Sequence, residues 1–142
     1  MKYVLLAALI LLFSGCAKRE DVTPTASSSM SKAEAIGLAR LWAAFGNPER
    51  NYCEVLPTGS MLPVFGSNAI LLLERVDSAD LLVGDIAIYA REGSPSVVHR
   101  VRAISSTAVL FSGDNNDPTK PDGWIAKERI QWRVAGIIYA KR

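Results

Sequence analysis

Thr58-Gly59-Ser60-Met61-Leu62-Pro63 is the stretch around which the rest of the chain is organised. A serine hydroxyl is a poor nucleophile until a neighbouring base takes its proton, so Ser60 needs a partner from elsewhere in the chain. Gly59 allows a second segment to approach the backbone closely, and Pro63 restricts the path by which the chain leaves. Taken alone, the stretch fits either a catalytic serine turn or an ordinary apolar turn before a strand. Other segments of the sequence are needed to choose between these two interpretations.

Three further segments follow this stretch along the chain: Gly84-Asp85-Ile86, Val98-His99-Arg100-Val101 and Gly113-Asp114-Asn115-Asn116. The four segments in this order resemble type I signal peptidases, in particular the histidine-containing branch found in archaea, the endoplasmic reticulum and some sporulating bacteria. The resemblance covers roughly residues 56–139, and the ordered set is far more specific than any one segment. It implies a serine endopeptidase, a signal peptidase-like hydrolase that cleaves exported peptides or preproteins.

The resemblance assigns the nucleophile and the base to particular residues. Ser60 matches the nucleophile of the family's Ser-Met-x-Pro motif, and His99 lies where the family's general base falls. The common bacterial branch uses lysine as the base, but no lysine occurs here between Lys32 and Lys120. A neutral imidazole can take the hydroxyl proton and return it to the leaving amine. A lone histidine on a strand is usually structural, so its place in the motif is what favours catalysis.

Three acids compete for the third position, in which a carboxylate holds the histidine ring. Asp114 matches the family's Gly-Asp-Asn motif, and Asp122 matches a second acid that follows it, at a slightly longer spacing than usual. We predict that Asp122 orients His99 and that Asp114 organises its loop. Asp117 precedes Pro118 and is expected to be a turn residue.

The oxyanion formed during attack needs two hydrogen-bond donors. The backbone N–H of Ser60 is the first candidate. The resemblance puts Thr58 where the bacterial branch has a hydroxyl residue that helps to bind the oxyanion, although threonine is also a common strand former. It further implies that Met61 packs beneath the site, and that Gly84 and Asp85 form a structural turn without a catalytic role.

The beginning of the chain is a short signal-peptide core, in which residues 3–13 are all apolar. This run is too short for an ordinary membrane span of about 20 residues. Its end, Leu12-Phe13-Ser14-Gly15-Cys16, resembles a bacterial lipobox, which implies that residues 1–15 are removed and that Cys16 is lipidated. The alternative is a plain signal peptide that happens to precede a cysteine. We expect an extracytoplasmic protein anchored to a membrane by lipid, and the absence of aspartate at Ala17 favours an outer membrane where one exists.

A tether and a helix are expected next. Residues 16–30 are rich in serine, threonine and charge and lack apolar periodicity, which indicates a flexible tether after the lipidated cysteine. An amphipathic helix is expected over residues 31–47, because Ser31 is a good N-cap and Glu34 follows at capping-box spacing. Its apolar face comprises Ala35, Leu38, Ala39, Trp42 and Phe45. Packing of this face on its own domain is favoured over insertion of its aromatic residues into lipid.

Residues 52–142 form the predicted catalytic domain, which is mainly β. Strands are expected over residues 68–76, 85–90, 96–104, 108–111 and 130–140. The last strand is expected to place Trp132, Val134 and Ile138 on one face. Residues 91–95 should turn the chain, and residues 113–123 should form a polar loop because Asp, Asn and Pro are frequent there. Short strands with turn signals between them predict a small antiparallel barrel or curled sheet, preceded by one short helix.

The composition speaks against several other kinds of function. The net charge of +2 is too small to indicate a nucleic-acid partner. The sequence holds no histidine and cysteine cluster for a metal and no glycine-rich phosphate loop, so no cofactor is expected. Cys16 and Cys53 are too few for a disulfide framework, and Cys53 is expected to be a small buried residue.

Two alternative functions stay open. The first is a peptide-binding module that has this fold but has lost the chemistry, which the presence of both Ser60 and His99 disfavours. The second is a self-cleaving repressor-type protease with a related barrel. That class needs a lysine base and usually a DNA-binding domain, and the export signal speaks against it.

Overall fold

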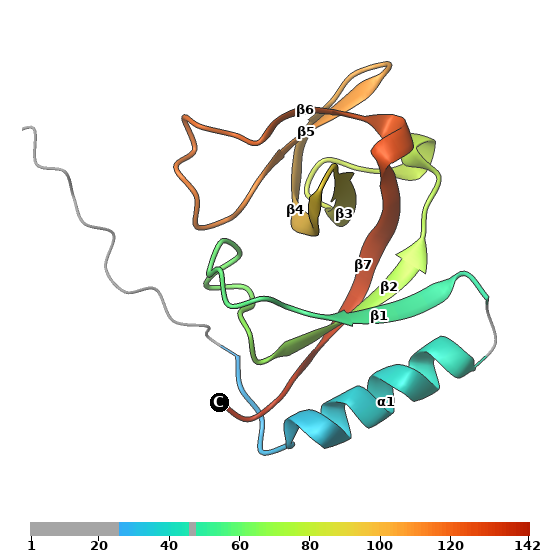
Figure 1. The fold of residues 1–142 in the computed structure, drawn as a ribbon, viewed down its shortest axis with the longest axis vertical. Helices are drawn as coiled ribbons and strands as arrows, with labels where there is room; N and C mark the ends of the chain where they lie inside the picture. Colours follow the sequence, from blue (N-terminus) through green and yellow to red (C-terminus); the bar gives the residue numbers. More distant parts are fainter. Residues whose placement is uncertain (1–25, 46–47) are drawn as a thin grey trace, which may run out of the picture.

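The computed structural model describes residues 26–45 and 48–142, so the predicted signal peptide, Cys16 and most of the tether lie outside the described residues. Within these residues, one α-helix precedes a seven-stranded antiparallel sheet that curls without closing, which confirms the mainly β class (Figure 1). The helix and strands are α1 Lys32–Ala44, β1 Arg50–Glu54, β2 Ala69–Arg75, β3 Ile86–Arg91, β4 Ser94–Ile104, β5 Ala108–Ser112, β6 Gly123–Ala126 and β7 Ile130–Tyr139. In the described residues, no helix has the length and apolar character needed to cross a membrane.

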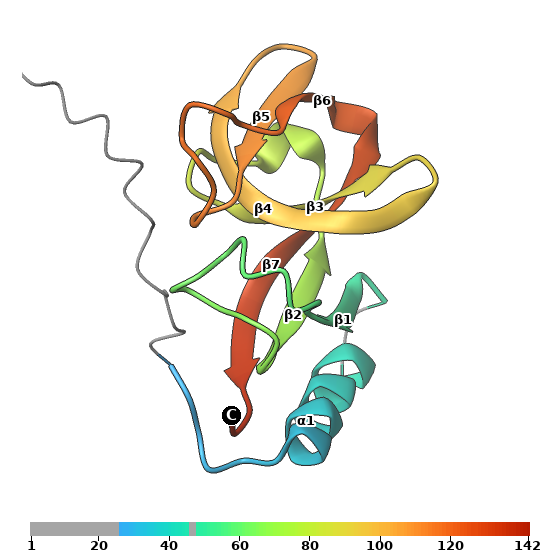
Figure 2. The same ribbon diagram turned by 60° about the vertical axis from the view of Figure 1, so that its left-hand side comes forward.

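The strand order β1-β2-β7-β3-β4-β5-β6 leaves β1 and β6 at the two edges of the sheet. The last strand, β7, lies in the middle, because it pairs with β2 on one side and with β3 on the other. Figures 1 and 2 show that β4, β5 and β6 fold over the upper half, while β1, β2 and α1 form the lower half. The connection between β1 and β2 lies directly below the long strand β4 (Figure 2).

Helix α1 begins as its sequence predicts. The Ser31 hydroxyl accepts a hydrogen bond from the Glu34 N–H, and the Glu34 carboxylate accepts one from the Ser31 N–H, which completes a capping box. Ala35 and Ala39 are fully buried, and they pack on the sheet against Ile70 of β2. Alanines on the inner face allow the helix to approach the sheet closely, so α1 packs on its own domain. The prediction that Leu38 and Phe45 share this packed face is wrong, because both side chains are exposed on another side of the helix.

Three features of the sheet differ from the sequence prediction. The first is the edge strand β1, since no strand was predicted over residues 50–54. The second is the short edge strand β6, in which the expected loop over residues 113–123 ends and which pairs with β5. The third is in β7, where Leu72 of β2 pairs with Gly136 but Leu73 pairs with Val134. This bulge inserts one residue and reverses the alternation of side chains beyond it. The prediction that Ile138 shares a face with Val134 is therefore wrong, and Ile138 packs on the helix side instead.

A buried cluster lies directly beneath the β1–β2 connection. Met61 and Phe65 of that connection are 2% and 1% exposed, and they pack with Leu71 and Leu73 of β2. A second cluster, under β3, β4 and β5, includes Tyr89, Val101 and Phe111. The connection that carries Ser60 thus rests on one packed cluster, and the strand that carries His99 borders both.

Candidate active site

Ser60 lies in a tight turn between β1 and β2. Gly59 has a φ of +72°, a left-handed conformation that favours glycine, and its carbonyl accepts a hydrogen bond from the Leu62 N–H at 3.2 Å. The buried Met61 holds the turn from below, as the resemblance implied. Ser60 itself is half-buried. The short polar side chain is therefore held at the surface of a packed cluster, on a backbone with little freedom to move.

The loop after β5 clamps this turn from the side. The Asn115 N–H donates to the Ser60 carbonyl at 2.8 Å, and the Asn115 side-chain amide donates to the Gly59 carbonyl at 3.1 Å. Gly113 has no room for a side chain, because a Cβ there would lie 2.6 Å from the Ser60 carbonyl oxygen. The Gly-Asp-Asn segment recognised in the sequence therefore fixes the backbone of the candidate nucleophile.

Replacing Gly113 with alanine is expected to destabilise the protein by about 1–3 kcal/mol, because the new methyl group must push the Ser60 turn away. Gly37 provides the matched control, since it lies mid-helix in α1 and a Cβ added there would meet nothing within 4 Å. Alanine at Gly37 is expected to stabilise the protein by about 0.5–1 kcal/mol. Denaturant unfolding measures both changes, and equal stabilities for the two variants would contradict the close approach.

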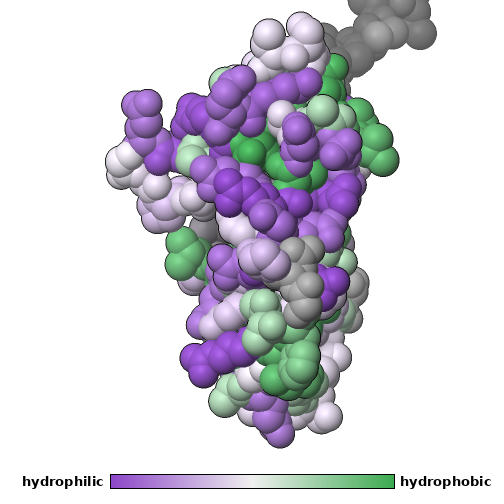
Figure 3. All heavy atoms as spheres, turned by 90° about the vertical axis from the view of Figure 1, so that its right-hand side faces the viewer, coloured by the Kyte–Doolittle hydropathy of each residue, from purple (hydrophilic) through white to green (hydrophobic). Residues whose placement is uncertain are grey.

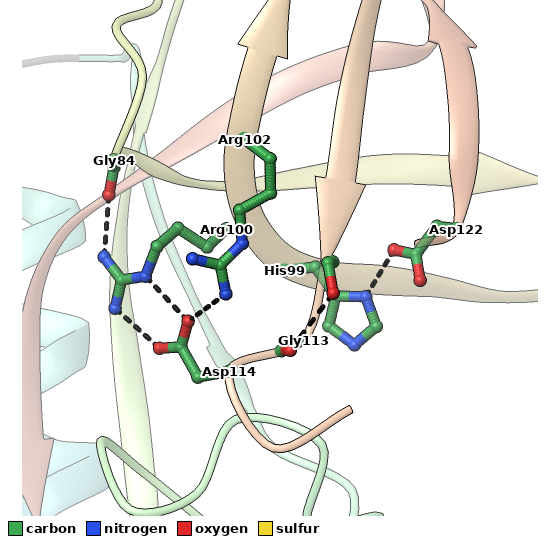
Figure 4. Close-up of polar contacts among 8 residues, drawn as sticks. Gly84, His99, Arg100, Arg102, Gly113, Asp114 and Asp122 are labelled. Carbon is green, nitrogen blue, oxygen red and sulfur yellow. Dashed lines mark hydrogen bonds and ion pairs between the residues drawn. The ribbon is translucent and has the colours of Figure 1, made fainter. Parts of the chain in front are cut away.

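His99 and Asp122 form a close pair at the far wall of the site. The Nδ1 atom of His99 lies 2.5 Å from Oδ2 of Asp122, and both side chains are almost buried, at 9% and 14% exposed. An ionised carboxylate only accepts hydrogen bonds, so Nδ1 is the nitrogen that donates to Asp122, and in a neutral ring of this tautomer Nε2 is the acceptor. Figure 4 shows this second ring nitrogen pointing away from Asp122. The structure thus places Asp122, rather than Asp114, against the imidazole.

Tyr89 of β3 is a member of the site that sequence reasoning missed. Its hydroxyl donates to the same oxygen of Asp122 at 2.9 Å, and its ring lies 4.9 Å from that of Phe111. Burial, together with the hydrogen bond to Asp122, raises the pKa of Tyr89 well above its ordinary value, so the hydroxyl stays a donor at neutral pH. The sequence holds no signal for this contact, since Tyr89 reads as an ordinary aromatic residue in an apolar strand.

Asp114 makes a different set of contacts. Its carboxylate accepts two hydrogen bonds from Arg100, at 2.8 and 2.6 Å, and one from Arg102 at 2.8 Å. Arg100 also donates to the Gly84 carbonyl at 2.7 Å, so it joins the loop to the turn before β3 (Figure 4). Asp114 therefore fastens the clamping loop to β4, which is the organising role predicted for it.

The remaining acids lie in turns. Asp85 accepts a hydrogen bond from the Leu82 N–H at 3.0 Å, which closes the turn that the sequence predicts there. Asp117 accepts one from the Thr119 N–H at 2.9 Å, in the manner of a turn residue before a proline. Among the described residues, no group of three or more His, Cys, Asp or Glu side chains is arranged to hold a metal ion.

The Ser60 hydroxyl makes a polar contact with the hydroxyl of Thr58. The two hydroxyl oxygens lie 3.3 Å apart. Within the described residues, no acceptor pairs with the Ser60 N–H, and no hydrogen bond joins Ser60 to His99. The Ser60 N–H and the Thr58 hydroxyl are thus two donors beside the nucleophile. Catalytic hydrogen bonds commonly tighten only when substrate is bound.

One open cleft of about 760 Å³ joins these groups, with Thr58, Ser60, His99 and Asp122 all in its lining. Cys53 also lines the cleft, but burial raises the pKa of its thiol to about 11. The thiol is therefore not ionised near neutral pH, and a thiolate is the form that attacks. Ser60, rather than Cys53, is the candidate nucleophile of the cleft.

The cleft has two walls of extended backbone. One wall is formed by residues 51–56, on and after the edge strand β1, and the other by residues 94–99 of β4. The first half of β4 pairs with β3, whereas its pairing with β5 begins only at Arg100. Residues 94–98 therefore present one unpaired strand edge within the described structure, and that edge ends at His99.

No protein-family model, no curated protein and no solved structure matches the chain.

Proposed function

We propose that this chain is a serine endopeptidase of the signal peptidase-like kind that its four ordered segments resemble. The observation that carries the proposal is the buried His99–Asp122 pair, which lines the same cleft as Ser60 and Thr58. A carboxylate-held imidazole and a serine on a fixed turn, both lining one cleft, are the groups with which serine peptidases activate a hydroxyl. No cofactor or metal takes part in this chemistry.

The proposed reaction begins when Ser60 Oγ attacks the carbonyl carbon of the scissile peptide bond. Nε2 of His99 accepts the hydroxyl proton, and Asp122 stabilises the resulting imidazolium through Nδ1. The Ser60 N–H and the Thr58 hydroxyl donate to the oxyanion. The imidazolium then protonates the leaving amine, the C–N bond breaks, and water hydrolyses the acyl-enzyme with His99 again as the base.

The substrate in this proposal is an extended peptide or preprotein segment. It would add as a strand to the unpaired edge of β4 over residues 94–98, which delivers a bond to the site next to His99. The apolar cleft floor, which includes Met61, Ile88 and Trp132, would receive alternate side chains. Main-chain hydrogen bonds supply affinity in such complexes, and the side-chain pockets supply specificity.

The proposed location is the extracytoplasmic side of a membrane, to which lipid on Cys16 holds the chain. This part of the proposal rests on the lipobox-like sequence alone, since Cys16 lies outside the described residues. Anchorage in an outer membrane would separate the enzyme from newly exported preproteins. A specialised exported peptide or protein is then the expected substrate.

Ser60→Ala is the direct test, made with the full chain in detergent and a mixture of extended peptides. Cleavage products of the parent should be absent with the variant, because alanine has no nucleophile. Ser67→Ala is the matched control, since Ser67 lies in the same connection between β1 and β2 but is exposed and outside the cleft lining. Mass spectrometry of the products reads out both variants. Equal cleavage by the Ser60 variant and the parent would refute the proposal.

A peptide-binding module without catalysis is the second candidate. The observation that favours it is the contact of the Ser60 hydroxyl with Thr58 in the absence of a bond to His99 among the described residues. Such a module would bind extended peptides equally well in the parent and in Ser60→Ala, and would release no products from either. The same peptide mixture, monitored by both binding and mass spectrometry, separates the two functions.

A further inference from the structure

Helix α1 has a second apolar face, which the fold does not use. Leu38, Leu41 and Phe45 are 46%, 52% and 71% exposed, whereas Ala35 and Ala39 on the inner face are fully buried. Positions 38, 41 and 45 are three and four residues apart, so they form one stripe along the outside of the helix. Packing of α1 on its own domain therefore leaves its larger apolar side chains in contact with water.

The stripe continues past the start of the helix. Met30, Gly37, Leu38 and Leu41 line one shallow groove, together with Ser29 and Glu34. Figure 3 shows apolar side chains gathered at the lower end of the molecule, where Figure 1 places α1. Contiguous exposed apolar patches of this kind mark places where a protein meets another surface. We call the half-buried Met30 and the exposed Leu38, Leu41 and Phe45 the outer stripe.

The path of the chain indicates what that surface is. Residues 26–30 are fixed beside the end of β7, because the Lys141 N–H donates to the Met30 carbonyl and Arg142 donates to the Ala26 carbonyl. The chain toward Cys16 therefore continues from Ala26, which is five residues before the N-cap of α1 at Ser31. The intervening residues 17–25 reach at most about 30 Å when fully extended. Lipid on Cys16 would thus hold this end of the domain within reach of the bilayer.

The charges at this end fit an anionic surface. Lys141 and Arg142 are exposed, and both lie against residues 26–30 at the start of the outer stripe. The one acid of the groove, Glu34, is held by the capping box at Ser31. Cationic side chains beside an apolar stripe are attracted to anionic lipid headgroups.

We propose that the outer stripe of α1 lies on the anionic bilayer to which the chain is anchored, and so fixes the orientation of the domain. The inference rests on the lipid anchor of the proposed function and adds a second membrane contact to it. Arg40 of α1 donates to the hydroxyl of Tyr52, which lines the cleft, so the cleft is one strand away from the helix. The site then takes its substrate close to the membrane surface.

The test uses the full lipidated chain in vesicles of phosphatidylcholine mixed with phosphatidylglycerol. With Cys53→Ser as background, a fluorophore is attached to Leu41→Cys or, as the control, to Trp124→Cys. Trp124 is 55% exposed and lies on β6, the other edge of the sheet. Nitroxide groups on the lipid acyl chains should remove most of the fluorescence at position 41 and leave position 124 unchanged. Leu38→Glu combined with Phe45→Glu should restore the fluorescence at position 41 without releasing the protein from the vesicles.

The other outcomes overturn the inference in distinguishable ways. Unquenched fluorescence at both positions on vesicle-bound protein excludes contact of α1 with lipid. Energy transfer between labels at position 41 of two molecules, without lipid quenching, shows that a second copy covers the outer stripe. Failure of the chain to float with vesicles removes the anchor itself. Peptide cleavage by the same preparations is measured in parallel, so loss of the lipid contact and loss of the peptidase are read separately.

Discussion

Replacing Asp122 with asparagine is expected to lower peptide turnover by on the order of a hundredfold or more while the fold stays intact. Asp122 is the carboxylate that contacts Nδ1 of His99, at 2.5 Å. Asparagine cannot stabilise the imidazolium that forms when Ser60 attacks, and its amide can favour the tautomer with Nε2 protonated. The turnover number and the melting temperature are measured together, and a large fall in turnover with an unchanged melting temperature is the expected result.

Nuclear magnetic resonance provides a readout of the same contact that does not depend on activity. His99 is the only histidine of the chain, so its ring signals need no assignment. Asp122→Asn should shift the Nδ1–H resonance strongly. Tyr89→Phe, which removes the second donor to the same oxygen, should shift it less. An unchanged resonance in Asp122→Asn would show that the pair does not form in solution.

Asp114→Asn is expected to act on stability instead. The variant removes the charge that pairs with Arg100 and Arg102, and it weakens the attachment of the loop that clamps Ser60. Loss of a buried ion pair costs about 3–5 kcal/mol, but the Arg side chains are partly exposed, so we expect about 2 kcal/mol. Turnover per folded molecule should fall far less than in Asp122→Asn.

Asp117→Asn is the matched control for this variant, because Asp117 lies in the same loop and is about half exposed. Its unfolding free energy should change by about 0.5 kcal/mol or less. Denaturant unfolding of the three variants separates the roles of the acids. A stable but inactive Asp114→Asn beside a fully active Asp122→Asn would reverse the assignment. Normal turnover in both would reduce the site to a dyad of Ser60 and His99.

Features that depend on local chemistry could be predicted from the amino-acid order. Ser31 and Glu34 cap α1 because their spacing satisfies the free N–H groups at a helix start. The bounds of β2, β3, β5 and β7 were predicted to within about two residues, because short apolar runs between turn residues are typical of strands. The placement of Asp122 beside His99 also agrees with the sequence hypothesis, which came from the resemblance to signal peptidases, where a second acid follows the Gly-Asp-Asn motif.

Features that depend on the pairing and register of distant strands could be seen only in the folded molecule. β6 pairs as an edge strand although its four residues follow a loop of turn formers, because β5 offers it an open edge. Ile138 changed faces because one inserted residue between Val134 and Gly136 reverses a two-residue period. Tyr89 reached Asp122 across 33 positions of sequence because the pairing of β3 with β4 sets Tyr89 opposite Val97, close to His99. Such contacts arise from register and packing between distant segments, and no local pattern of residue types encodes them.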